Sequence, residues 1–164
     1  MYRKKDFLFM DVFDVKGKNI GCIKDLIVDF NRGIVLGFTI ISYRIFQATQ
    51  YILKEDIISF NNHMVVSKCR KGSLIGLSEI KLMDVIDLEG NIVGTLEDII
   101  FEGKNFVING IVIWTGYLAS LLYGKKIALI KDIILGEDSI LYFGNKETIS
   151  FSNTPSTILF KSVK

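Results

Sequence analysis

Eight acidic side chains recur at equivalent places in two stretches of the chain, and clustered carboxylates are the residues here most able to do chemistry. They are Asp11, Asp14, Asp25 and Asp29 in the first stretch, and Asp84, Asp87, Asp98 and Glu102 in the second. Clustered oxygens suit hard cations such as Ca²⁺, but the spacing is unlike that of an EF-hand loop. We therefore interpret Asp14 as part of a turn and the other carboxylates as solvated strand ends.

The residue types needed for nucleophilic or redox chemistry occur without partners. His63 is the only histidine, and Cys22 and Cys69 form no Cys-x-x-Cys pair. A catalytic triad, a zinc site and a disulfide scaffold are therefore unsupported. The glycines match neither a dinucleotide-binding fingerprint nor a phosphate-binding loop. The sequence predicts a protein that is not an enzyme and that binds no metal and no organic cofactor.

An internal repeat organises the chain and must position these side chains. Met10–Ile40 aligns with Met83–Ile113 at an offset of 73 residues without a gap, and ten of 31 positions are identical. Self-similarity over such a length indicates a duplicated structural unit. We expect two domains, residues 1–74 and 75–164, which divide within the basic stretch Ser67–Glu79.

The match resumes at an offset of 76 further along each copy. There Asp56-Ile57-Ile58 aligns with Asp132-Ile133-Ile134, so the connection after Trp114 is about three residues longer in the second copy. The final stretch, Thr148–Lys164, has no counterpart. Because it contains several large apolar residues, we expect it to pack on a domain.

Each copy has the pattern of short strands joined by glycine turns. Alternation and β-branched residues predict strands over Met10–Val15, Gly21–Phe30, Ile34–Ser42, Gln50–Leu53 and His63–Val66. Closure of such a small sheet removes its exposed edges. The predicted fold is all-β, with two tandem small β-barrels of about five or six short strands each.

One uncharged stretch, Phe106–Gly124, is long enough by length alone to cross a bilayer as a helix. The repeat argues against that interpretation, because Ile108–Trp114 aligns with the strand-like Val35–Ile41. We expect a strand followed by a loop. The N-terminus has acidic residues and too short an apolar stretch for a signal peptide, so we expect a cytoplasmic protein.

The loop after that strand is a candidate docking element. Its apolar and aromatic residues are Trp114, Tyr117, Leu118, Leu121, Leu122 and Tyr123. Either they fill the interface between the two barrels, or they form an exposed patch that contacts a partner or a membrane. We favour the interface, because small domains need additional buried surface.

Charge is uneven along the chain. Residues 1–74 hold 12 Lys/Arg and 7 Asp/Glu, a net of +5, and residues 75–164 hold 8 and 11, a net of −3. Two basic clusters could contact an anionic partner such as RNA, a membrane surface or an acidic protein. Their members are Arg3, Lys4 and Lys5, and Lys68, Arg70 and Lys71.

The repeated pattern D-V-x-D-x-x-G-x-x-x-G-x-x-x-D-x-x-x-[DE], followed by an apolar strand with a glycine and then by Asp-Ile, resembles the PRC-barrel domain. It spans roughly residues 8–67 and again 81–144. With two copies in a chain of this length, the protein resembles uncharacterised PRC-barrel proteins of spore-forming Firmicutes. This resemblance makes a role in sporulation conceivable. The resemblance implies a small β-barrel that serves in docking or assembly.

The resulting expectation is a non-enzymatic adaptor whose partner is another protein. The alternative is an RNA- or ribosome-associated maturation factor that uses the basic N-terminal half. A peripheral membrane contact is a third option for the partner. Salt dependence separates the first two, because RNA binding weakens steeply as salt rises.

Overall fold

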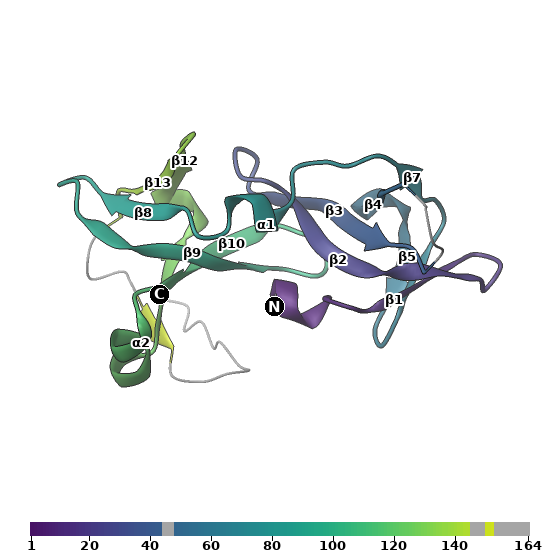
Figure 1. The fold of residues 1–164 in the computed structure, drawn as a ribbon, viewed down its shortest axis with the longest axis horizontal. Coiled ribbons are helices and arrows are strands. Elements are labelled where there is room, and N and C mark those ends of the chain that lie inside the picture. The colour runs from purple at the N-terminus through teal and green to yellow at the C-terminus, as the bar shows by residue number, and fades with distance from the viewer. Residues whose placement is uncertain (44–47, 145–149, 153–164) are drawn as a thin grey trace.

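The computed structural model describes residues 1–43, 48–144 and the strand at 150–152, and it consists of two β-sheet modules joined end to end (Figure 1). Each module has a seven-stranded sheet. The predicted all-β architecture with two similar domains is therefore confirmed, with more strands than the five or six expected. The strand that ends each sheet order, Arg70–Lys71 in one and Ser150–Ser152 in the other, is short and lies outside the strands predicted from the sequence.

Module one starts with a short 3-10 turn and continues as a curved sheet in the order β5-β6-β1-β2-β3-β4-β7. Its elements are η1 (Lys4–Asp6), β1 (Asp11–Asp14), β2 (Asn19–Asp29), β3 (Ile34–Ile41), β4 (Gln50–Leu53), η2 (Lys54–Asp56), β5 (Ile57–Phe60), β6 (Met64–Val66) and β7 (Arg70–Lys71). Neighbouring strands are antiparallel except β1 and β6, which are parallel.

Module two repeats this order as β12-β13-β8-β9-β10-β11-β14, again with one parallel pair, β8 and β13. Its elements are α1 (Leu77–Ile80), β8 (Asp84–Asp87), β9 (Ile92–Phe101), β10 (Ile108–Trp114), α2 (Tyr117–Tyr123), β11 (Lys125–Leu129), η3 (Ile130–Asp132), β12 (Ile133–Leu135), β13 (Ser139–Tyr142) and β14 (Ser150–Ser152). The two halves of the sequence repeat thus form the same strands, as predicted.

The stretch Ser67–Glu79, expected to be a bridge, is partly built into both modules. Residues 70–71 form β7 and pair with β4, while Leu77–Ile80 form α1, which opens module two. A short segment that is rich in basic residues and contains glycines does not by itself reveal that it forms a strand or a helix. The exact boundary at residue 74 stays a prediction.

The modules meet around an approximate two-fold axis. Ile34 of β3 forms a β-bridge with Val107, its own equivalent at offset 73. The flanking hydrogen bonds are equivalent too, since Val35 N–H donates to the Phe106 carbonyl and Ile108 N–H to the Gly33 carbonyl, both at 2.8 Å. A contact that each half makes reciprocally with the other is the signature of a two-fold interface.

The junction is filled by aromatic side chains rather than by the loop after β10. Phe7 and Phe38 from module one pack against Phe101 and Phe106 from module two, with Tyr2 and Phe60 alongside. Buried side chains of both modules form one continuous hydrophobic cluster through this junction. The two modules therefore share a core instead of meeting at a thin, polar surface.

Candidate docking surface

The helix α2 lies between the end of β10 and the start of β11, at the position where the second copy is longer than the first. Gly116 and Gly124 bracket it with backbone φ angles of 98° and 79°, which glycine adopts at little cost. These two turns lift α2 away from the sheet, at the lower left of the molecule in Figure 1.

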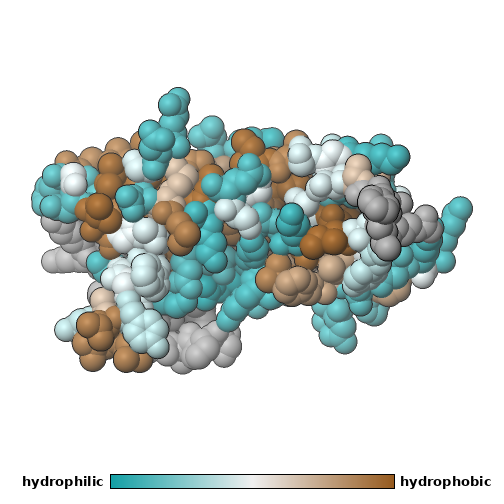
Figure 2. Space-filling model, in the orientation of Figure 1, coloured by the Kyte–Doolittle hydropathy of each residue, from teal (hydrophilic) through white to brown (hydrophobic). Residues whose placement is uncertain are grey.

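Large apolar side chains cover the outward side of this helix. Tyr117, Leu118, Leu121, Leu122 and Tyr123 are between 63% and 80% exposed, and Trp114 at the end of β10 is 42% exposed. The space-filling view shows the resulting apolar patch as a brown protrusion at the lower left (Figure 2). We call these six residues the α2 patch.

The hypothesis that these residues fill the interface between the two barrels is wrong. The junction is already closed by the aromatic residues Phe7, Phe38, Phe101 and Phe106, and the α2 patch lies on the outside. The other interpretation of the same residues, as a docking patch, remains a prediction. The expected packing of Thr148–Lys164 falls almost entirely outside the described residues.

A membrane-spanning helix is not among the described residues. Phe106–Gly124 divides into strand β10 and the seven-residue α2, and no described helix is long and apolar enough to cross a bilayer. The expectation of a strand at Ile108–Trp114 is confirmed, whereas the expectation of a loop after it is wrong, because Tyr117–Tyr123 form the helix α2.

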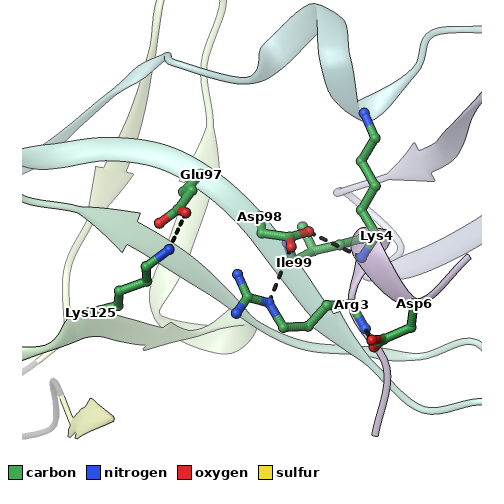
Figure 3. A network of polar contacts seen from close by, with 7 residues as sticks. All are labelled: Arg3, Lys4, Asp6, Glu97, Asp98, Ile99 and Lys125. Carbon is green, nitrogen blue, oxygen red and sulfur yellow. Dashed lines mark hydrogen bonds and ion pairs between the residues drawn. The ribbon is translucent and has the colours of Figure 1, made fainter. Parts of the chain in front are cut away.

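In the first basic cluster, Arg3, Lys4 and Lys5, two of the three side chains form ion pairs within the protein. Arg3 Nε lies 3.1 Å from Asp98 Oδ2, and Lys4 Nζ lies 2.7 Å from Asp25 Oδ1 (Arg3 and Asp98 in Figure 3). Both aspartates lie on the long strands β9 and β2. The charges of Arg3 and Lys4 are therefore paired within the protein at the module junction. Their contact with an anionic partner stays a prediction.

In the second basic cluster, Lys68, Arg70 and Lys71, one side chain forms an internal ion pair and the two lysines are exposed. Arg70 pairs with Asp56, and this hydrogen bond raises the pKa of the Arg70 guanidinium. Lys68 and Lys71 are exposed, as is Lys5 of the first cluster, which also has a polar contact. The contact of these three lysines with an anionic partner stays a prediction.

Asp14 has the turn role assigned to it, and its repeat equivalent Asp87 has the same role. Asp14 accepts hydrogen bonds at 2.9 Å from the N–H groups of Lys16 and Lys18, and Asp87 does the same for Glu89 and Asn91. The hydrogen bond from Lys18 lowers the pKa of Asp14. The prediction of turn chemistry is confirmed at this position.

Asp25 and Asp98, by contrast, are not solvated strand ends, because each is only 7% exposed. Asp98 accepts the N–H of Ile99 at 2.9 Å and of Lys4 at 3.2 Å, besides pairing with Arg3. Asp25 accepts the N–H groups of Leu26 and Ser78, both at 2.9 Å. Each aspartate therefore holds the short helical turn that opens the other module.

The remaining candidates for chemistry stay isolated. His63 packs edge-on against Phe13, with ring centroids 5.3 Å apart. Cys22 is buried and Cys69 is half-buried, and burial raises the pKa of the Cys69 thiol. In the part of the chain that the structure describes, no three His, Cys, Asp or Glu side chains gather in a way that could hold a metal ion.

The fold and surface together define a two-module β scaffold with an external apolar patch. Comparison with protein families adds a more specific assignment: the PRC-barrel domain matches residues 1–68, so module one is a PRC-barrel domain. Module two follows as a second β-sheet domain with the same strand order. No curated protein matches the chain.

Proposed function

We propose that the protein is a non-enzymatic adaptor, made of two PRC-barrel-like modules, that docks a partner protein through the α2 patch. The observation that supports this most is the exposure of five large apolar side chains on one seven-residue helix. Aromatic and leucine side chains that are buried only on binding are the usual anchors of protein interfaces.

The scaffold has the rigidity that such an adaptor needs. The shared core and the reciprocal β-bridges hold the modules in one arrangement, so α2 is presented at a fixed place. A binding element held on a rigid body loses little conformational entropy when it docks.

The proposal places the protein in the cytoplasm. The protein has two free cysteines, as is usual in a reducing compartment. We also propose that the protein is similar to PRC-barrel proteins of spore-forming Firmicutes, on the basis of its two-copy sequence pattern. The RNA-binding alternative loses support, because Arg3, Lys4 and Arg70 are engaged in internal ion pairs.

The double substitution Leu118→Ser/Leu121→Ser tests the proposal. We expect binding of the partner to weaken more than tenfold, since burial of a leucine contributes about 2 kcal/mol. The melting temperature should change by less than about 2 °C, because exposed substitutions usually alter stability by under about 0.5 kcal/mol. Affinity capture from the native cytoplasm, with and without nuclease, identifies the partner, and titration measures its affinity.

Leu82→Ser/Leu88→Ser is the matched control, since these leucines are similarly exposed but lie outside the patch. It should retain the partner. Trp114 is the only tryptophan, so its emission should be that of a partly exposed indole in the free protein and shift to shorter wavelength on binding. The proposal fails if capture depends on RNA, if the patch variant keeps its partner, or if only binding to anionic lipid vesicles is lost.

A further inference from the structure

A shallow hollow of about 340 Å³ lies at the module junction, away from α2. The turn Phe30–Gly33 of module one forms one wall. The other wall consists of five residues of module two, namely Ile130, Lys131, Ile133, Ile134 and Leu135. Its surface is mostly apolar, with Arg32 and Lys131 among the residues that line it. The volume is at the lower end of the range of small binding pockets, about 300–1,000 Å³.

The repeat shows how the two copies differ beside this hollow. Gly33 and Phe106 are equivalent residues at offset 73, and their backbone φ angles are 61° and 62°. Their carbonyl groups accept the equivalent hydrogen bonds from Ile108 and Val35, both at 2.8 Å. The backbone at this one position thus has the same φ angle and the same hydrogen bond across the junction in both copies, whereas the side chain differs.

On the other side of the axis, the residue equivalent to Gly33 is Phe106, which has a phenyl ring. It is buried, and its centroid lies 6.0 Å from those of Phe38, Phe60 and Phe101. A Cβ atom on Gly33 would lie 3.6 Å from Ile130 Cγ1, which lines the hollow. The hollow therefore lies beside a position where one copy has glycine and the other has phenylalanine, and Phe30, which lines it, stands where the other copy has Gly103.

Charge distinguishes the two sides as well. Arg32 and Lys131 are exposed, and none of the nine residues that line the hollow is acidic. Among the described residues no carboxylate forms an ion pair with either side chain. Their repeat equivalents are Asn105 and Glu55, so the positive pair occurs only on the side that has Gly33.

We propose that this hollow is a second docking site, which takes one aromatic side chain from an acidic segment of a partner protein. The aromatic ring lies beside Gly33, where the other copy has Phe106. Carboxylates beside it meet Arg32 and Lys131, whose charges steer and orient an acidic segment. The site does not depend on the α2 patch, and together the two would let the adaptor hold two partners.

Titration of the full-length, ¹⁵N-labelled protein with the peptide acetyl-Asp-Phe-Asp-amide tests this site. We expect amide signals of Gly33, Ile134 and Leu135 to shift with millimolar affinity, and binding to weaken as salt rises. The matched peptide acetyl-Asp-Ala-Asp-amide should bind at least tenfold more weakly. Equal shifts from both peptides, or shifts elsewhere only, would overturn the proposal.

Two substitutions locate the site. Gly33→Phe should place a ring beside the hollow from within and abolish peptide binding, as Phe106 shows that phenylalanine fits this backbone. Ile134→Glu should also abolish binding by placing a carboxylate in the hollow, and it decides the matter if Gly33→Phe does not fold. Ile58→Glu, its similarly exposed repeat equivalent, should leave binding unchanged. If the Ile134→Glu variant binds the peptide with unchanged affinity, the site is refuted. If the Leu118→Ser/Leu121→Ser variant loses peptide binding, the peptide binds at α2 instead.

Discussion

We expect Phe7→Ala to lower the free energy of unfolding by about 3–5 kcal/mol, the usual cost of truncating a buried phenylalanine. Phe7 is 1% exposed, and its ring lies 4.9 Å from that of Phe38 and 5.6 Å from that of Phe101, measured between centroids. It therefore packs against both modules. Since stabilities of whole proteins are about 5–15 kcal/mol, this single truncation removes a large share.

Thermal and chemical denaturation measure the effect. The melting temperature should fall by roughly 6–20 °C, at about 2–4 °C per kcal/mol for a chain of this size. Phe9→Ala is the matched control, because Phe9 is two residues away and 68% exposed. It should stay within about 0.5 kcal/mol of the wild-type protein. Similar melting temperatures for the two variants would show that the junction is not a shared core.

The repeat made the strands predictable, because glycines and carboxylates mark the same turns in both copies. Asp14 and Asp87 show how local this information is, since each accepts the N–H groups of the residues two and four positions further along the chain. A turn that depends on its own neighbours can be recognised from sequence alone.

The junction could not be predicted in this way, because it depends on which segments meet in space. Arg3-Lys4-Lys5-Asp6 and Gly76-Leu77-Ser78-Glu79 are equivalent turns at offset 73, yet they share no identical residue. Their likeness lies in the backbone: Asp6 accepts the N–H of Arg3 at 2.7 Å, and Glu79 that of Gly76 at 2.8 Å. Each turn then crosses to the other module, which no pattern within one copy reveals.

The same crossing explains both errors about individual side chains. Asp25 and Asp98 lie at polar positions of amphipathic strands, and the other module's turn buries them. The α2 patch is apolar enough to belong to an interface, but Phe7 and its aromatic neighbours already occupy that space. Exposure is a property of what else packs nearby, so composition alone cannot supply it.

Asp98→Ala should be nearly as damaging as Phe7→Ala, at about 3–5 kcal/mol, because it leaves a partly buried cation and two N–H groups without their acceptor. The side chains of Arg3 and Asp98 are only 21% and 10% exposed, so solvent screens this ion pair little. Asp25→Ala should give a similar loss, since Asp25 pairs with Lys4 and accepts the N–H groups of Leu26 and Ser78.

Glu97→Ala is the control for Asp98→Ala, because Glu97 is the next residue of β9 and also forms an ion pair, with Lys125 (Figure 3). The Lys125 side chain is 40% exposed, and exposed pairs contribute about 0–1 kcal/mol. A double-mutant cycle with Arg3→Met isolates the ion pair from the backbone hydrogen bonds. If Asp98→Ala and Glu97→Ala are equally stable in denaturant titrations, the reciprocal turns do not hold the modules together, and the rigidity of the two-module scaffold must come from the aromatic core alone.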